Sequence, residues 1–208
     1  MRLRNVKGAK DKIDKSLYVI TDYNKYRGKF ATLFNNNNRI YIEIGMGKGN
    51  FIINMAKLNP DINFIGIEKY DSVIIRACEK LEFENITNLK LIKMDAIKID
   101  EVFYKEIDMI YLNFSDPWPK DRHQKRRLTD INFLKKYDIL FKNKKNIIFK
   151  TDNRKLFEFS IKSFTDYGYK INDLSLDLHK DNIFNVKTEY EIKFSTKGYP
   201  IYMISVTK

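Results

Sequence analysis

The hydrophobic and polar positions divide the chain from Arg39 onward into short and long segments in alternation. Short runs rich in Ile, Val and aromatic residues predict seven β-strands, over residues 39–44, 62–68, 88–94, 108–114, 146–151, 169–178 and 201–207. Apolar residues at helical spacing predict helices over residues 50–58, 71–84, 130–142 and 154–167. This alternation is typical of an α/β fold around a mostly parallel sheet.

The last two predicted strands space their apolar residues evenly, which indicates an antiparallel pair at one edge of the sheet. We therefore expect a seven-stranded, mostly parallel sheet with an antiparallel edge strand and helices on both faces. Residues 31–208 should form a single domain, because compact domains contain roughly 100 to 200 residues. Residues 1–30 are polar and basic with little periodicity, and they predict an arm or a short helix outside the core.

Several classes of protein are disfavoured by composition. No apolar run approaches the roughly 18 residues of a membrane span, and the N-terminal sequence MRLRNVKGAKDKIDK has no apolar signal core. We expect a cytoplasmic protein without membrane contact. Cys78 is the single cysteine, so an internal disulfide is excluded, and with only His123 and His179 beside it no Cys/His zinc set can form. We expect no metal.

The formal charge of +12 suggests a polyanionic partner. The alternative explanation is genome bias, because Lys, Ile and Asn are all abundant, as an AT-rich genome would produce. The arginines are more informative, because Arg122, Arg126 and Arg127 fall within six positions and Arg2 and Arg4 form a second group. Arginine is the better bidentate ligand for phosphate. The clusters therefore predict phosphate contacts, with a solvated loop as the alternative.

Ligands of open α/β sheets bind at the carboxyl ends of the strands, where this chain has a glycine-rich loop, EIGMGKGNF. Gly45, Gly47 and Gly49 allow the backbone to turn tightly and approach a ligand. The third glycine is one residue early for the dinucleotide pattern, and Glu43 stands two residues before the first. This resembles the E-x-G-x-G-x-G loop of class I S-adenosylmethionine-dependent methyltransferases, although a glycine turn without a ligand remains an alternative.

Acids also follow the next two strands. Glu68, 21 residues after Gly47, can accept both hydroxyls of a ribose. Asp95 can accept the adenine amine while backbone amides near Ala96 address the ring, or it can cap the helix that follows. These positions suit an adenosine-bearing cofactor.

The fourth predicted strand leads into NFSDPWPKDRHQKRR, residues 113–127. Amino-group methyltransferases carry D/N-P-P-Y/F/W at this place, whereas this chain reads Asp116-Pro117-Trp118-Pro119-Lys120. Trp118 between two prolines can anchor a rigid turn or stack on an extruded base. Asp152, after the fifth strand, can lie beside the site or cap the next helix. Residues 185–194 are a polar loop before the last strand.

With EIGMGKGNF, GIE, LNFSDPWPKDRHQKRRL, KTDN and TEYEIKF in order, the chain resembles the bacterial tRNA (guanine-N7-)-methyltransferase family from about Arg2 to Tyr202. The resemblance implies a Rossmann-like class I methyltransferase fold, S-adenosylmethionine as cofactor and tRNA as partner. The substrate would be a variable-loop guanosine, methylated at N7. A monomer and a homodimer both remain open, and the basic arm would touch the tRNA backbone or fold on binding.

The resemblance also implies roles for individual residues. The cofactor would contact the glycine loop and the strand-end positions, which are Glu43, Gly45, Gly47, Glu68, Asp95, Ala96 and Asp116. Asp116 also matches the active-site residue. Substrate contacts would come from Lys120, Asp152, Thr188, Glu189, Tyr190 and Glu191. RNA contacts would come from Arg122, His123, Gln124, Lys125, Arg126 and Arg127.

The chemistry of guanine N7 supports an aspartate that acts without a raised pKa. N7 carries a lone pair and no proton, so attack on a sulfonium methyl needs no general base, and His123 is expected to be a polar contact. Positioning and electrostatics then supply the acceleration. Two alternatives stay open: an amino-methyltransferase acting on adenine or glutamine, and a non-catalytic RNA-binding module on a vestigial methyltransferase fold.

Overall fold

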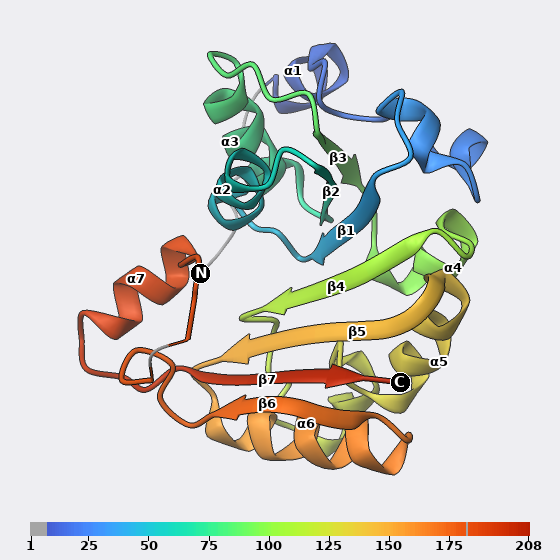
Figure 1. The fold of residues 1–208 in the computed structure, drawn as a ribbon. Coiled ribbons are helices and arrows are strands. Elements are labelled where there is room, and N and C mark those ends of the chain that lie inside the picture. The colour runs from blue at the N-terminus through green and yellow to red at the C-terminus, as the bar shows by residue number, and fades with distance from the viewer. Residues whose placement is uncertain (1–7, 182) are drawn as a thin grey trace.

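The computed structural model describes residues 8–181 and 183–208, so the phosphate contacts expected of Arg2 and Arg4 lie outside the described residues. One seven-stranded sheet organises the chain, with the strand order β3-β2-β1-β4-β5-β7-β6 (Figure 1). The strands are β1 (Arg39–Ile44), β2 (Ile62–Glu68), β3 (Leu89–Lys93), β4 (Ile107–Asn113), β5 (Phe141–Thr151), β6 (Lys170–Ser175) and β7 (Tyr202–Thr207).

The strand directions confirm the predicted mostly parallel sheet. β1 pairs in parallel with β2 and β4, and the parallel pairing continues outward to β3 and β5. β7 is antiparallel to both β5 and β6, so the reversed strand lies one place inside the edge. The predicted antiparallel pair at this edge is therefore confirmed.

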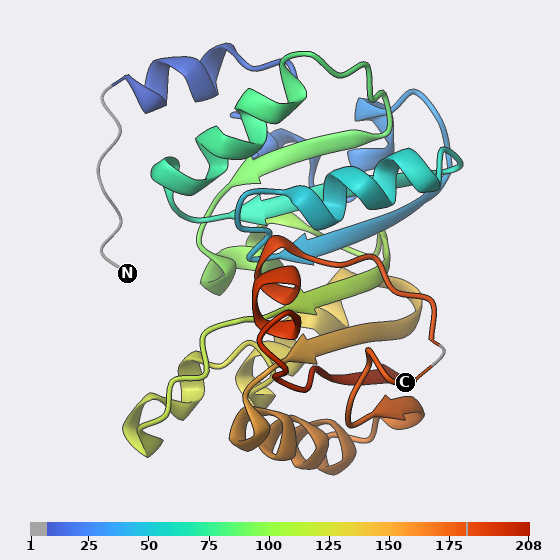
Figure 2. The same cartoon turned by 90° about the vertical axis from the view of Figure 1, so that its left-hand side faces the viewer.

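Helices cover both faces of the sheet (Figure 2). The side chains of α1 (Ala9–Lys15), α2 (Asn50–Leu58) and α3 (Asp71–Leu81) share one hydrophobic cluster with β2 and β3. Those of α4 (Ile99–Val102), α5 (Ile131–Leu140) and α6 (Arg154–Asp166) share the cluster on the opposite face. Strands buried on both faces need apolar residues at successive positions, which is why β2 reads INFIGIE.

Short 3₁₀ turns complete the fold, namely η1 (Tyr23–Tyr26), η2 (Phe30–Leu33), η3 (Ala96–Lys98) and η4 (Asp121–Arg126). Within the described ranges, no helix has both the length and the apolar character needed to cross a membrane.

The expectation that the N-terminal segment lies outside the core is wrong for its described part. Ala9 and Ile13 of α1 are buried against α3, and Phe30 is fully buried. The backbone then runs beside β3, where Leu91 N donates to Tyr18 O at 2.7 Å and Ile20 N donates to Leu91 O at 2.9 Å. The backbone of this segment thus pairs with β3, an edge strand that would otherwise expose unpaired backbone groups.

The loop expected over residues 185–194 contains a helix, α7 (Glu189–Ser195). Thr188 caps it, because Thr188 Oγ1 accepts from Glu191 N at 2.9 Å while the Glu191 carboxylate accepts from Thr188 N at 3.3 Å. The sequence T-x-x-E is the signature of this reciprocal cap. β5 also begins five residues earlier than expected, at Phe141, and its register against β4 shifts between Ile107 and Met109.

The connection from β1 to α2 requires glycine at two positions for different reasons. Gly47 has φ +58°, with open space around the position of a Cβ atom. Gly49 has φ +80°, and a Cβ atom there would lie 2.8 Å from Cβ of Ala77 on α3. α2 can therefore pack this closely on α3 only if residue 49 has no side chain.

Replacing these glycines separates backbone strain from the steric clash. Gly47→Ala should lower the free energy of unfolding by about 1–2 kcal/mol, the cost of a left-handed residue. Gly49→Ala should lower it by a further 1–3 kcal/mol, roughly, because of overpacking. Urea unfolding measures both, with Gly47→Ala as the matched control for backbone strain. Equal losses for the two variants would contradict the close approach of α2 to α3.

Candidate active site

The carboxyl ends of the five parallel strands meet at one end of the sheet, on the side where α7 lies (Figure 1). We call this end of the sheet the carboxyl edge, as distinct from its edge strands β3 and β6. Four of the expected acids, Glu68, Asp95, Asp116 and Asp152, end or follow β2, β3, β4 and β5, and Glu43 lies inside β1 two residues before Gly45. Parallel pairing therefore brings together acids that are up to 109 positions apart in the sequence.

Glu68 is bound to the glycine loop. Gly47 N donates to Glu68 Oε2 at 3.1 Å, while the amides of Lys69 and Tyr70 donate to Oε1 at 2.7 and 3.1 Å. Burial raises the pKa of Glu68 in spite of these three donors, and the charge of Asp116 adds to the increase. Oε1 already accepts two bonds and Oε2 accepts one, so Oε2 can accept a further bond from a ligand hydroxyl.

Glu43 is a buried carboxylate, and one of its two oxygens has no hydrogen-bond partner among the described residues. Asn113 Nδ2 donates to Glu43 Oε1 at 2.8 Å, and Oε2 has no hydrogen-bond partner among the described residues. Burial raises the pKa of Glu43 to about 8, against the opposing effects of Asn113 and of the Lys150 charge. A buried acceptor without a donor is costly, and a ligand that supplies a donor or a positive charge would satisfy it.

Asp95 already makes the contacts of a helix cap. Its side chain accepts from Ile97 N at 3.1 Å at the start of η3, and it pairs with Lys69 at 2.6 Å. Burial raises the pKa of Asp95, but Lys69 and the Ile97 amide outweigh it, so the pKa lies below its usual value. The neighbouring Ala96 begins η3 and is half-buried.

The turn after β4 is held by one of its own arginines. Phe114 and Trp118 both have positive φ, 51° and 41°. Arg127 donates from Nε to Pro117 O and from Nη2 to Trp118 O, both at 3.0 Å, and its guanidinium lies 4.4 Å from the centre of the Phe159 ring. Arg127 therefore braces the turn, although it is grouped in the sequence with the expected RNA contacts.

Trp118 is half-buried within the same loop. The Arg126 guanidinium lies 4.9 Å from the centre of its ring, and the His123 ring meets it edge-on at 5.8 Å. These contacts fit an anchor for the turn. Other polar side chains of the loop are exposed to solvent, and they include the acid expected at the active site: Asp116, Lys120, Asp121, Arg122, Gln124, Lys125 and Arg126.

The expected substrate contacts lie on both sides of the carboxyl edge. Tyr190 Oη donates to Asp152 Oδ2 at 3.3 Å, and burial together with Asp152 raises the pKa of Tyr190 to about 12. Glu189 pairs with Lys80 at 2.6 Å and lies 4.0 Å from Lys48 of the glycine loop. α7 is thus tied to elements from both halves of the sheet.

Two site residues were not expected from the sequence. Asn113 binds Glu43, and Lys150 binds Glu191 of α7 through a contact of 2.9 Å. Both stand in the buried carboxyl-terminal parts of their strands, β4 and β5. A polar residue in a strand that is buried on both faces is the signal that could have identified them.

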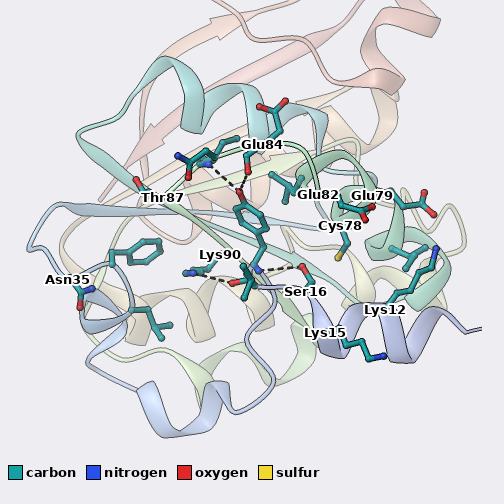
Figure 3. Close-up of a pocket in the computed structure, with 18 residues that line it drawn as sticks. Lys12, Lys15, Ser16, Asn35, Cys78, Glu79, Glu82, Glu84, Thr87 and Lys90 are labelled. Carbon is teal, nitrogen blue, oxygen red and sulfur yellow. Dashed lines mark hydrogen bonds between the residues drawn. The ribbon is translucent and has the colours of Figure 1, made fainter.

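A groove of about 720 Å³ lies away from this edge (Figure 3). It is lined by α1, by α3 and by the segments that precede β1 and β3, and Lys12, Cys78 and Lys90 are among its residues. No residue expected in the active site lines it. In the described part of the chain, no group of three or more His, Cys, Asp or Glu residues is placed to hold a metal ion.

Comparison with solved structures supports the fold. A structure described as an antibiotic-related methyltransferase matches with a TM-score of 0.69 at 16% identity and covers 87% of this chain and 93% of its own. A S-adenosylmethionine-dependent methyltransferase from Aquifex aeolicus matches with a TM-score of 0.58 at 13% identity, over 95% and 97% of the two chains. At these identities the similarity establishes a Rossmann-like methyltransferase fold.

Comparison of sequences is more specific. The model of a family described as "putative methyltransferase" matches residues 37–204. A tRNA (guanine-N(7)-)-methyltransferase of Lachnoclostridium phytofermentans is 49% identical over 207 residues, which cover 98% of this chain and 97% of the relative. One of Bacillus subtilis is 50% identical over 209 residues, with 99% and 98% covered. The chain therefore belongs to the tRNA (guanine-N(7)-)-methyltransferase family.

Proposed function

We propose that the protein transfers a methyl group from S-adenosylmethionine to N7 of a variable-loop guanosine in tRNA, and that it acts in the cytoplasm. The observation that carries the proposal is the arrangement of Glu43, Glu68 and Asp116 around the glycine loop, beside an exposed basic loop. Similarity over the full chain to enzymes named for this reaction supports it.

The residues of the carboxyl edge fit S-adenosylmethionine. Gly45 and Gly47 let the backbone approach the cofactor, and Asp95 with the amide of Ala96 can address adenine. Glu68 can accept a ribose hydroxyl at Oε2, where one acceptor site is left. The unpartnered Oε2 of Glu43 is an acceptor for the cationic methionine part. When bound, the cofactor supplies an electrophilic methyl group on a sulfonium sulfur.

The proposed catalytic role of Asp116 is to position guanine and to stabilise charge. N7 attacks through its own lone pair, so no side chain has to remove a proton. The methylated ring is cationic, and a carboxylate nearby lowers the energy of the charge as it forms. The same carboxylate can accept the N1–H and amine edge of guanine, which would select guanine over adenine.

The proposed tRNA contacts divide between two elements. Lys120, Arg122 and Arg126 are exposed on the loop after β4 and would bind phosphates. Tyr190 and Asp152, which contact each other across the edge of the sheet, would lie beside the target nucleoside. Arg127 would contribute indirectly, because it holds the turn that carries Asp116 and Lys120.

The proposal predicts one methylated product. Incubation with labelled S-adenosylmethionine and unmodified tRNA should yield N7-methylguanosine, identified by nucleoside mass spectrometry. A tRNA with adenosine in place of the target guanosine is the matched control and should stay unlabelled. A product methylated on an exocyclic amine would indicate an amino-methyltransferase instead, and cofactor binding without any transfer would indicate an RNA-binding module.

Asp116→Asn and Asp116→Ala should each lower the single-turnover methylation rate by about 10²-fold or more, because the developing positive charge loses its carboxylate. Asp121→Asn removes an exposed acid of the same loop and should leave the rate within about twofold, as surface charges contribute little. Rapid-quench measurements at saturating tRNA test this. Near-normal rates for both Asp116 variants would contradict the assigned role.

The raised pKa of Glu43 predicts a pH-dependent affinity for the cofactor. A positive ligand group binds the ionised carboxylate, so affinity should increase as the pH rises to about 8 and should fall by up to about tenfold per unit below it. Glu43→Gln should bind more weakly at pH 8 and lack this part of the dependence. Calorimetric titration from pH 6 to pH 8.5 measures both proteins, and the titration of the ligand itself cancels in the comparison. Parallel profiles would exclude Glu43 as the titrating group.

A further inference from the structure

We propose that Lys150 is a positioning residue, which through its buried ion pair with Glu191 holds α7 in the orientation that binds tRNA. The inference rests on the proposed function, and it adds a residue for which the sequence indicated no role. It also reassigns Glu191 and Thr188, expected as substrate contacts, to the internal support of that segment.

Lys150 lies at the carboxyl end of β5, and its side chain is only 3% exposed. Its ammonium group donates to three acceptors of the segment around α7: Glu191 Oε2 at 2.9 Å, Asn185 Oδ1 at 3.0 Å and the Val186 carbonyl at 3.1 Å. An ammonium group has three donors, so all of them are used within the protein. Lys150 is therefore committed to fixing this segment.

Glu191 is completely buried, and both of its oxygens are engaged from within. Oε2 accepts from Lys150 and from Thr188 N, while Oε1 accepts from Asn185 and lies 3.1 Å from His179 Nε2. The side chain of Glu191 is 0% exposed. A carboxylate that is not exposed to solvent and has these partners can stabilise the α7 segment, but it cannot contact a nucleoside.

The segment needs such support because it has little stability of its own. α7 has only seven residues, and isolated helices of this length do not persist in water. Its other ties, from Glu189 to Lys80 and from Tyr190 to Asp152, involve partly exposed groups. Pairs of that kind contribute little, whereas loss of one partner of a buried pair is costly.

The position held by this pair matters for the site. The Tyr190 ring lies 5.0 Å from the Phe114 ring, and Phe114 stands two residues before Asp116. Tyr190 also contacts Asp152 at the end of β5. A shift of α7 would therefore displace the side chains proposed to surround the target nucleoside. The Glu189–Lys48 pair joins α7 to the glycine loop, but at 4.0 Å and partly exposed it is too weak to move the loop or Glu68.

Lys150→Met tests the proposal by removing the charge while keeping most of the side-chain volume. The KM for tRNA should rise by about tenfold or more. The Kd for S-adenosylmethionine should rise by a smaller factor, because loss of the Lys150 charge only raises the pKa of Glu43 further. Backbone amide exchange at Glu191 and Ile192 should accelerate in the absence of tRNA, and exchange in α2 should not. The matched control is Lys145→Met, which removes another lysine of β5, one that pairs with Asp138 at 2.7 Å away from the site; it should leave all three quantities unchanged.

A second variant covers the case in which Lys150→Met does not fold. Lys150→Met with Glu191→Met replaces the whole buried pair by apolar side chains, which is often neutral for stability. This double variant should fold and still show the raised KM for tRNA, because Thr188 N and Asn185 lose their acceptor. A folded variant with wild-type KM and amide exchange would overturn the proposal, as would an equal loss of cofactor affinity.

The amide exchange measurement separates this inference from the proposed function. If the wild-type protein fails to methylate tRNA, the proposed function falls, but faster exchange in Lys150→Met would still support the structural anchor. If the wild-type protein makes N7-methylguanosine and Lys150→Met behaves like Lys145→Met, only the anchor is wrong.

Discussion

The parallel pairing of β1 with β2 and β4 is the constraint on which the rest of this structure depends. It places the ends of five strands at one edge, and with them the acids that the chain separates by up to 109 positions. The apolar residues of these strands are buried on both faces, so a slip in register would move whole sets of side chains to the opposite face, where they do not fit the packing. The site is therefore as precise as the packing of the sheet beneath it.

Burying a charged group at the carboxyl edge costs solvation free energy, which an oppositely charged side chain or a bound ligand can offset. Lys150 and Glu191 offset each other, which makes the pair an internal anchor for α7. Glu43 is different, because Asn113 satisfies one of its oxygens and the other has no partner in the described chain. Two buried carboxylates of the same site thus differ: Glu191 is fully engaged by its own chain, and Glu43 has an oxygen without a partner among the described residues.

The basic loop after β4 shows that neighbouring charged residues can have different roles. Arg126 and Arg127 are adjacent, yet Arg127 donates to two carbonyls of the turn while Arg126 is exposed above Trp118. Two residues of this stretch have left-handed backbone conformations, and such strain persists only where the surroundings enforce it. Rigid placement of Asp116 and Lys120 follows from that local bracing.

The sequence by itself determined the order of strands and helices, the parallel sheet and the strand-end acids, because apolar periodicity and glycine spacing are local properties that tertiary contacts did not override. It also contained the cap of α7 in Thr188 and Glu191, although a short polar helix has no periodicity by which to recognise it. Only the tertiary structure decided that the N-terminal segment covers β3, that Arg127 faces inward and that Lys150 meets Glu191 from 41 positions away. Those outcomes depend on which buried charges and strand edges face each other after folding. A local sequence pattern does not specify contacts between residues that are far apart in the chain.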